Sequence, residues 1–152
     1  MLPGIEARIK GVQGMVFTSK ITLQTQGNGD THDITDAVAR ALDESGMMAG
    51  TVTIFCPGST SGITTIEFEE GAVADLQRLF DEIVPPNREY QHNERWGDGN
   101  GHSHVRAALL GPSLSVPFFG RRMTLGTWQQ VIFVDFDNRP RDREIIVQIV
   151  GD

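Results

Sequence analysis

The sequence has few of the residues and patterns that mark several large classes of protein. Its single cysteine, Cys56, excludes an internal disulfide and a cysteine-based zinc cluster. No apolar run is long enough for a transmembrane helix, and the first residues lack the apolar core of a secretion signal, so we expect a cytoplasmic protein without membrane contacts. Lys and Arg number 13 against 20 Asp and Glu, a net charge of −7, which argues against a nucleic-acid partner.

What remains is the composition of one ordinary folded domain. The chain has 152 residues, of which 39% are hydrophobic and 22% charged, enough to bury a substantial core. Seventeen glycines indicate many tight turns, and therefore strands and hairpins rather than a helical bundle. No linker, repeat or low-complexity segment interrupts the sequence, so residues 1–152 are predicted to form a single domain.

The spacing of apolar residues predicts two to three helices. Residues 33–46 bring their apolar side chains to one helical face and end at Gly46. Residues 72–86 repeat this pattern and stop at two prolines, and residues 102–111 fit a shorter helix.

Alternating or β-branched segments bounded by glycine and proline predict the strands. These segments are residues 15–27, 50–58, 61–71, 113–120, 121–126, 127–138 and 143–151. Gly120 and Arg121 are expected to turn one hairpin, and residues 137–142 the last one. The mixture predicts an α+β fold with a mixed, mostly antiparallel sheet and helices on one side.

Titratable groups are densest between Tyr90 and Arg106. They include His92, Glu94, Asp98, His102 and His104. Imidazole and carboxylate are ordinary ligands of zinc and related metals, and a histidine oriented by Asp98 or Glu94 also suits acid–base chemistry. His102 and His104 face the same way if the chain is extended there, but diverge by about 200° if the helix has begun. The alternative is that these histidines only cap the helix or bond loop carbonyls.

Other candidate residues are scattered along the chain. A guanidinium such as Arg106, with the small hydroxyl of Ser113, suits a phosphate group. Glu67 follows β-branched residues in a predicted strand, so its carboxylate must face solvent or a polar site. Cys56 is expected to be a buried small residue and a poor nucleophile. Residues 135–143 alternate in charge, which is typical of a turn with solvated ion pairs.

Several separate motifs resemble one family. The segments GTVTIFCPGSTSGITTIE, HSHVRA, LLGPSLSVPF and LGTWQQVIFVDFDNRPRDREIIVQ occur in the order typical of the YjbQ-like family, also called the secondary thiamine-phosphate synthase family. The resemblance runs from about residue 10 to the C-terminus. It implies a compact mixed α/β domain that assembles as a homotrimer, with polar pockets near subunit boundaries.

The sequence departs from this family at one position that matters. Many members have a histidine where Gly58 stands, and many have only one histidine in the block that matches His104. Glu67 matches the family acid, whereas Ile66 replaces an asparagine. We therefore expect His102 to supply the imidazole that Gly58 lacks, in a site of His92, His102 and His104 with Glu67 or Asp98 as the carboxylate.

The resemblance implies a transferase that joins a hydroxymethylpyrimidine diphosphate to a thiazole phosphate and releases pyrophosphate. In that interpretation Glu67 and His104 are catalytic, and a divalent metal, Mg²⁺ or Zn²⁺, lies on His92, Asp98, His102 and His104. The phosphorylated substrate is held by Arg106, Ser113, Gln129, Arg139 and Arg141. Two alternatives stay open: a non-catalytic trimer that binds a metal or a phosphorylated metabolite, and a metal-assisted phosphohydrolase.

Overall fold

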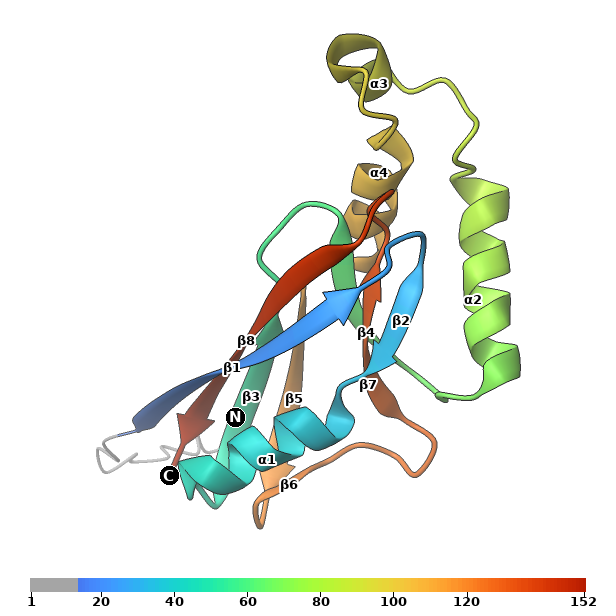
Figure 1. Ribbon diagram of the computed structural model, residues 1–152. Coiled ribbons are helices and arrows are strands. Elements are labelled where there is room, and N and C mark those ends of the chain that lie inside the picture. Colours follow the sequence, from blue (N-terminus) through green and yellow to red (C-terminus); the bar gives the residue numbers. More distant parts are fainter. Residues whose placement is uncertain (1–13) are drawn as a thin grey trace, which may run out of the picture.

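The fold consists of two antiparallel sheets with helices on both sides of the smaller one (Figure 1). The computed structural model describes residues 14–152. Its strands are β1 (Met15–Thr25), β2 (Asp30–Asp33), β3 (Ala49–Phe55), β4 (Ser61–Ile66), β5 (Ser113–Phe119), β6 (Arg122–Met123), β7 (Gln130–Asp135) and β8 (Arg141–Gly151). Its helices are α1 (Thr35–Ser45), α2 (Glu70–Ile83), α3 (Gln91–Trp96) and α4 (Gly101–Leu110). The predicted α+β class is confirmed.

The five-stranded sheet has the order β1-β8-β3-β5-β6, and the three-stranded sheet has the order β2-β7-β4. β1 and β8 pair along eleven residues, from Met15 opposite Gly151 to Thr25 opposite Arg141. The inner face of the larger sheet packs against α1 and the smaller sheet in one apolar cluster that contains Val38, Ile54 and Val147. The larger sheet is thus covered on one face only.

The strand β7 is buried on both faces, which explains its unbroken apolar run. Val131 and Phe133 join the cluster beneath the larger sheet, whereas Ile132 and Val134 face a second cluster with Phe80 of α2. Phe80 stacks edge-on against Phe136, with 4.8 Å between ring centroids. The smaller sheet is therefore the middle layer, and α2 and α4 cover its far side (Figure 1).

Three details differ from the sequence-based predictions. The strand β4 ends at Ile66, so Glu67 lies in an exposed connection and not within a strand; the chain turns there because the Glu69 carboxylate caps α2 through the N–H groups of Gly71 and Ala72. The polar loop contains the short helix α3. Residues 137–142 turn the chain from β7 to β8, but these strands lie in different sheets and do not form a hairpin.

The described residues contain no helix that is both long and apolar enough to cross a membrane.

Candidate functional site

The strongest candidate site lies where the loop between β3 and β4 meets α4. A cavity of about 210 Å³ opens there. It is lined by Gly58, Ser59, Ser61, His104, Ala107, Ala108 and Pro112. We call it the His104 pocket.

The His104 ring is held in one orientation by a backbone carbonyl. Its Nδ1 lies 3.0 Å from the carbonyl oxygen of Ser59. A carbonyl oxygen can only accept, so Nδ1 carries the proton and the neutral ring presents Nε2 as an acceptor. Nε2 has no hydrogen-bond partner among residues 14–152. Nε2 is therefore available to contact a ligand.

His92 and Asp98 lie beside His104. The two imidazole rings are 4.4 Å apart between centroids, and His92 Nε2 lies 3.2 Å from Asp98 Oδ2. The backbone N–H of Asn100, together with His92, holds the pKa of Asp98 below its ordinary value. This arrangement leaves one nitrogen on each imidazole for a ligand.

The described part of the chain does not fit a resident metal ion by itself. Within residues 14–152, no three His, Cys, Asp or Glu side chains come close enough together to hold one. His92 and His104 could supply two nitrogen ligands, whereas closed zinc sites need four ligands and catalytic ones usually three.

His102 does not join His92 and His104. It is 4% exposed and points to the other side of α4, toward Tyr90, with 6.3 Å between ring centroids. Burial, and to a smaller extent the charge of Arg106, lowers the pKa of His102. Gly58 lines the His104 pocket and His102 does not, so the structure does not bring His102 to the gap that Gly58 leaves. Because His102 and His104 are two residues apart on α4, helical geometry makes their rings point to different sides of the helix.

Behind the pocket lies a cluster of buried charges that the sequence suggested were solvated. Asp135 and Asp137 are 0% and 1% exposed. Arg143 forms two parallel bonds to Asp135, with 2.7 Å from Nε to Oδ2 and 2.7 Å from Nη2 to Oδ1. Thr60 accepts from Arg143 Nη2 at 2.8 Å and donates to Asp137 Oδ2 at 2.9 Å. Arg141 also contacts Asp137 at 2.9 Å, so the cluster holds two carboxylates and two guanidinium groups, although Asp137 Oδ1 and Arg141 Nε have no hydrogen-bond partner among residues 14–152.

This cluster perturbs the pKa values of its members. Burial raises the pKa of Asp137, but the bonds from Arg141 and Thr60 outweigh it and leave the pKa below its ordinary value. Burial lowers the pKa of Arg143, and the bonds to Asp135 reverse that shift, so the guanidinium stays charged. Burial also raises the pKa of Cys56, which makes the thiol a poor nucleophile, as expected.

Arg143 borders the position where many relatives are expected to carry histidine. A Cβ at residue 58 would lie 3.4 Å from Arg143 Nη1. Nη1 has no hydrogen-bond partner among residues 14–152, whereas Nε and Nη2 are engaged. Ser61 Oγ, also near this loop, is buried without a hydrogen-bond partner in the described chain. Arg143 was not among the predicted site residues; the matching i, i+2 spacings of Asp135 with Asp137 and of Arg141 with Arg143 were the available signal.

Arg106 is committed to holding the fold together. It is 5% exposed, and its Nε and Nη2 donate to the carbonyl of Val84 at 3.0 and 2.8 Å. Nη2 also donates to Asp81 at 2.8 Å. The predicted phosphate ligand therefore secures the C-terminal end of α2 to α4.

The other predicted substrate ligands do not gather around His104. Ser113 is exposed at the start of β5, and Arg139 is exposed in the turn after β7. The amide of Gln129 bonds Gly126 N and Thr65 Oγ1, next to Glu67 at the far end of β4. The strand β4, six residues and about 17 Å long, lies between Glu67 and the loop whose Ser59 contacts His104. Within one copy of the chain, His104 and Glu67 therefore lie toward opposite ends of β4.

Comparison with known proteins identifies the family. The family model described as UPF0047 protein YjbQ-like matches residues 19–152. The chain belongs to the YjbQ-like family. A UPF0047 protein of Methanothermobacter thermautotrophicus is 38% identical over 141 residues, 93% of this chain and 96% of that protein. The UPF0047 protein YugU of Bacillus subtilis is 34% identical over 132 residues, 86% of this chain and 97% of that protein.

Solved structures agree with the YjbQ-like fold. A YbjQ-like protein of unknown function from Sulfolobus solfataricus has a TM-score of 0.87 and 32% identity, covering 91% of this chain and 99% of that one. An uncharacterised YjbQ/UPF0047 protein from Clostridium acetobutylicum has a TM-score of 0.79 and 36% identity, covering 86% and 98%. The family resemblance of the sequence is confirmed.

Proposed function

We propose that the His104 pocket binds a phosphorylated small molecule, and that this chain is a transferase of the kind that the family resemblance implies. The observation that carries the proposal is the His104 ring, whose proton is fixed on Nδ1 by Ser59 and whose Nε2 is open to a ligand. A phosphate oxygen at Nε2 would favour protonation of the ring, which then donates a charge-assisted hydrogen bond.

The reaction requires stabilisation of a departing diphosphate more than it requires a nucleophile. The bond between the pyrimidine methylene carbon and the diphosphate oxygen breaks, and both electrons leave with pyrophosphate. The thiazole nitrogen then gives its lone pair to the resulting carbocation. Cationic groups that are already oriented, here the imidazolium of His104 and the guanidinium of Arg143, would offset the charge that develops on the leaving group.

We further propose that a divalent metal, Mg²⁺ or Zn²⁺, arrives with the diphosphate and is not resident in the protein. The scarcity of clustered ligands within residues 14–152 supports this proposal. Mg²⁺ in particular is usually bound through substrate phosphates and a few carboxylates. His92 and Asp98 are the side chains nearest to His104 that could contact such an ion.

The separation of Glu67 from His104 supports an assembled site. If both residues act on one substrate, they must come from different copies of the chain, since β4 holds them apart within one copy. We propose a homotrimer in which His104 of one copy faces Glu67 and Gln129 of the next. Cyclic assemblies of this kind bring two different surface patches together at each interface.

The first experiment measures thiamine phosphate formation from the two phosphorylated halves with Mg²⁺. The wild type is compared with His104→Ala and with His32→Ala, a histidine in β2 that does not line the pocket. We expect His104→Ala to lower the rate at least tenfold while His32→Ala retains it. Equal trace rates in all three proteins would contradict the transferase proposal.

A second experiment tests the shared site by complementation. Chains carrying His104→Ala and chains carrying Glu67→Gln are each expected to be inactive, and co-expression should restore on the order of a quarter of the activity, because random mixing rebuilds some intact pockets. No recovery from folded, mixed trimers would show that the two residues do not meet across an interface.

The second candidate function is that of a binding protein without catalytic activity. The closely spaced rings of His92 and His104, which could both contact a metal ion, favour it. Thermal stabilisation separates the two functions. A ligand at 100 times its dissociation constant adds about 2.7 kcal/mol to the free energy of unfolding. Stabilisation by Zn²⁺ alone would favour the binding protein, and stabilisation by pyrophosphate only with Mg²⁺ would favour the transferase.

A further inference from the structure

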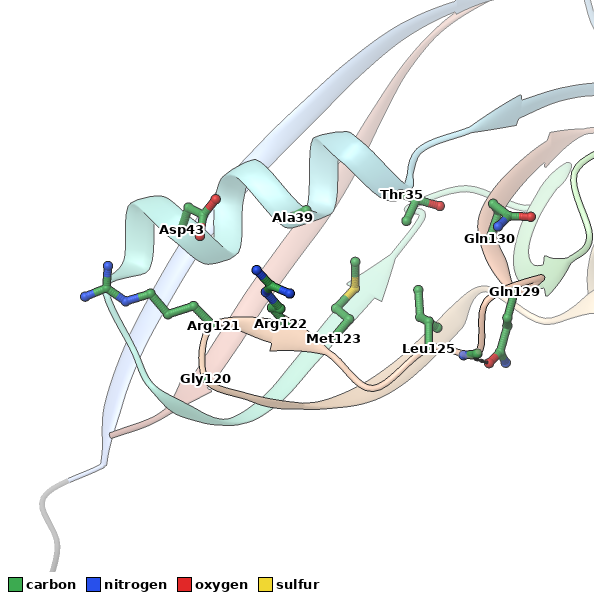
Figure 2. A pocket seen from close by; sticks show the side chains of 11 residues that line it. Thr35, Ala39, Asp43, Gly120, Arg121, Arg122, Met123, Leu125, Gln129 and Gln130 are labelled. Carbon is green, nitrogen blue, oxygen red and sulfur yellow. Dashed lines mark hydrogen bonds between the residues drawn. The ribbon is translucent and has the colours of Figure 1, made fainter.

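A second pocket lies at the other end of β3, between α1 and the hairpin of β5 and β6 (Figure 2). Its volume is about 600 Å³. It is lined by Thr35, Ala39, Asp43, Gly120, Arg121, Arg122, Met123, Leu125, Gly126, Gln129 and Gln130. We call it the hairpin pocket. The seven residues of β3 separate it from the loop of the His104 pocket by about 20 Å, so the two cavities are distinct.

Two adjacent arginines give this pocket a positive wall in a chain of net charge −7. Figure 2 shows the side chains of Arg121 and Arg122 beside α1, with Asp43 above them. Neither guanidinium forms an ion pair with any of residues 14–152. A guanidinium presents a planar fork of donors that matches phosphate and carboxylate oxygens.

The remaining polar groups of the pocket are already engaged. The Gln129 amide bonds Gly126 and Thr65, and Gln130 bonds Phe68 N and Thr127 O. Thr35 Oγ1 donates to Asp33 and accepts from Val131 N. An incoming ligand therefore meets the two arginines, Asp43, and an apolar floor.

The backbone of Arg121 is strained for a residue with a side chain. Gly120 and Arg121 form a two-residue turn between Phe119 and Arg122, with φ angles of 58° and 62°. Such turns favour glycine or asparagine at both positions, and the left-handed conformation costs another residue about 1–2 kcal/mol. Backbone strain of this kind occurs often at functional sites.

We infer that the hairpin pocket binds a small organic phosphate, with the phosphate on Arg121 and Arg122 and the apolar part on Ala39, Met123 and Leu125. The inference does not rest on the proposed transferase, because Arg121, Arg122 and the three apolar residues are not part of the His104 pocket; Gln129 lines the hairpin pocket and is the one residue shared with the assembled site proposed above. The lining combines three apolar side chains with charged and polar groups, and small-molecule sites likewise pair apolar surface with a few polar groups that fix the ligand. Asp43 opposes the anion and limits its affinity.

Phenyl phosphate is the probe, and inorganic phosphate and phenol test its two halves. Binding of each compound is measured by calorimetry and by the NMR chemical shifts of the backbone amides. We expect phenyl phosphate to bind at least fivefold more tightly than either half and to shift the amides of Gly126 and Arg122. Shifts confined to the His104 pocket, or affinity equal to that of inorganic phosphate, would overturn the inference.

Substitutions of opposite sign test the assignment. Arg121→Gly and Arg122→Ala should each weaken binding at least fivefold, whereas Asp43→Asn should strengthen it at least twofold. Arg121→Gly also relieves the turn, so a loss of affinity there cannot come from unfolding. Arg88→Ala, which removes an exposed arginine outside the pocket, is the charge control. If Arg88→Ala weakened the binding of phenyl phosphate equally, the effect would come from the net charge of the protein, and the proposed site would be contradicted.

Discussion

At the scale of single residues, Thr60 joins two buried charges of opposite sign. Its hydroxyl donates to Asp137 and accepts from Arg143, and its carbonyl accepts from Phe136 N at 2.8 Å. The next residue back, Ser59, supplies the carbonyl that orients His104. The charge cluster thus fixes the loop on which the candidate site depends.

Replacing Thr60 by valine keeps the shape of the side chain and removes both hydroxyl bonds. We expect the free energy of unfolding to fall by about 1–3 kcal/mol, because a buried carboxylate oxygen and a guanidinium N–H lose a partner. Urea denaturation measures the change. Thr53→Val, which removes a more accessible hydroxyl from β3, should change it by no more than about 0.5 kcal/mol. Equal effects of the two substitutions would contradict the role of Thr60.

His102 makes the stability of the fold depend on pH. Its pKa in the folded state lies below the ordinary value of 6.5, so the folded chain resists protonation more than the unfolded chain does. The resulting stability is fully present above pH 6.5 and is lost as the pH falls through the lower pKa of the folded state. We expect the urea midpoint to drop between pH 7.5 and pH 5.5, and His102→Gln to reduce that drop. His32→Gln measures how much another imidazole contributes. An unchanged drop in His102→Gln would exclude His102 as the cause.

At the scale of elements, the tight turn between β1 and β2 is pressed against the turn after β7. A Cβ at Gly27 would lie 2.3 Å from the carbonyl oxygen of Asp137 and 2.7 Å from that of Arg139. Gly46, at the end of α1, has a similar φ of 71° against 74°, but nothing lies within 4 Å of its added Cβ. Substitutions at Gly46 therefore report the cost of the backbone conformation alone, whereas substitutions at Gly27 report that cost together with steric crowding.

We expect Gly27→Ala to destabilise the protein clearly more than Gly46→Ala. The second substitution meets only the left-handed conformation, which costs about 1–2 kcal/mol. The first must in addition displace backbone that carries Asp137. Thermal denaturation of the two variants measures the difference, and equal melting temperatures would show that the two turns are not tightly packed.

Hydrophobic periodicity predicted most of these elements, and the failures have physical causes. The apolar spacing of α1, α2 and β7 reports burial directly, so their positions followed from the sequence. The helix α3 has no buried residue and left no such pattern. The pairing of β8 with β1 and β3, and not with β7, depends on contacts between segments that are distant in the sequence.

The candidate site was predictable only in part, for a related reason. His92, Asp98 and His104 lie close together in the sequence, and the structure brings them together. In the sequence, the segment that contains Asp135 and Arg143 has the alternating charges of a solvated turn. The pattern of charges does not show whether the side chains are buried. Arg106 has the chemistry of a phosphate ligand, but the chain uses it to hold Val84.

At the scale of the whole molecule, the outer face of the five-stranded sheet lies open. Its exposed residues include Thr18, Thr51, Phe55, Ser115 and Phe119. Sheets with one uncovered face are stable when that face is polar, and this face combines hydroxyl groups with large apolar side chains. We propose that this face extends the trimer interface, which must also bring His104 of one copy to Glu67 and Gln129 of the next.

The proposed trimer predicts a mass of three copies of a 16.7 kDa chain in solution. Light scattering coupled to size-exclusion chromatography measures it. Ser115→Arg, placed in the middle of the outer face, should shift the mass toward one copy without loss of helix or strand by circular dichroism, because a buried unpaired charge opposes assembly. Lys20→Arg, an exposed exchange on β1, is the control. A monomeric wild type would contradict the proposal.

The pairing of β8 between β1 and β3 has a consequence for synthesis of the protein on the ribosome. β8 is made after the other seven described strands, yet it occupies the second position in the larger sheet. Until it has left the exit tunnel, β1 has no partner strand and β3 has one open edge. Unpaired edges of this kind can associate with other chains. The larger sheet must therefore close after translation of β8, and the nascent chain is most exposed to aggregation, and most in need of a chaperone, before that moment.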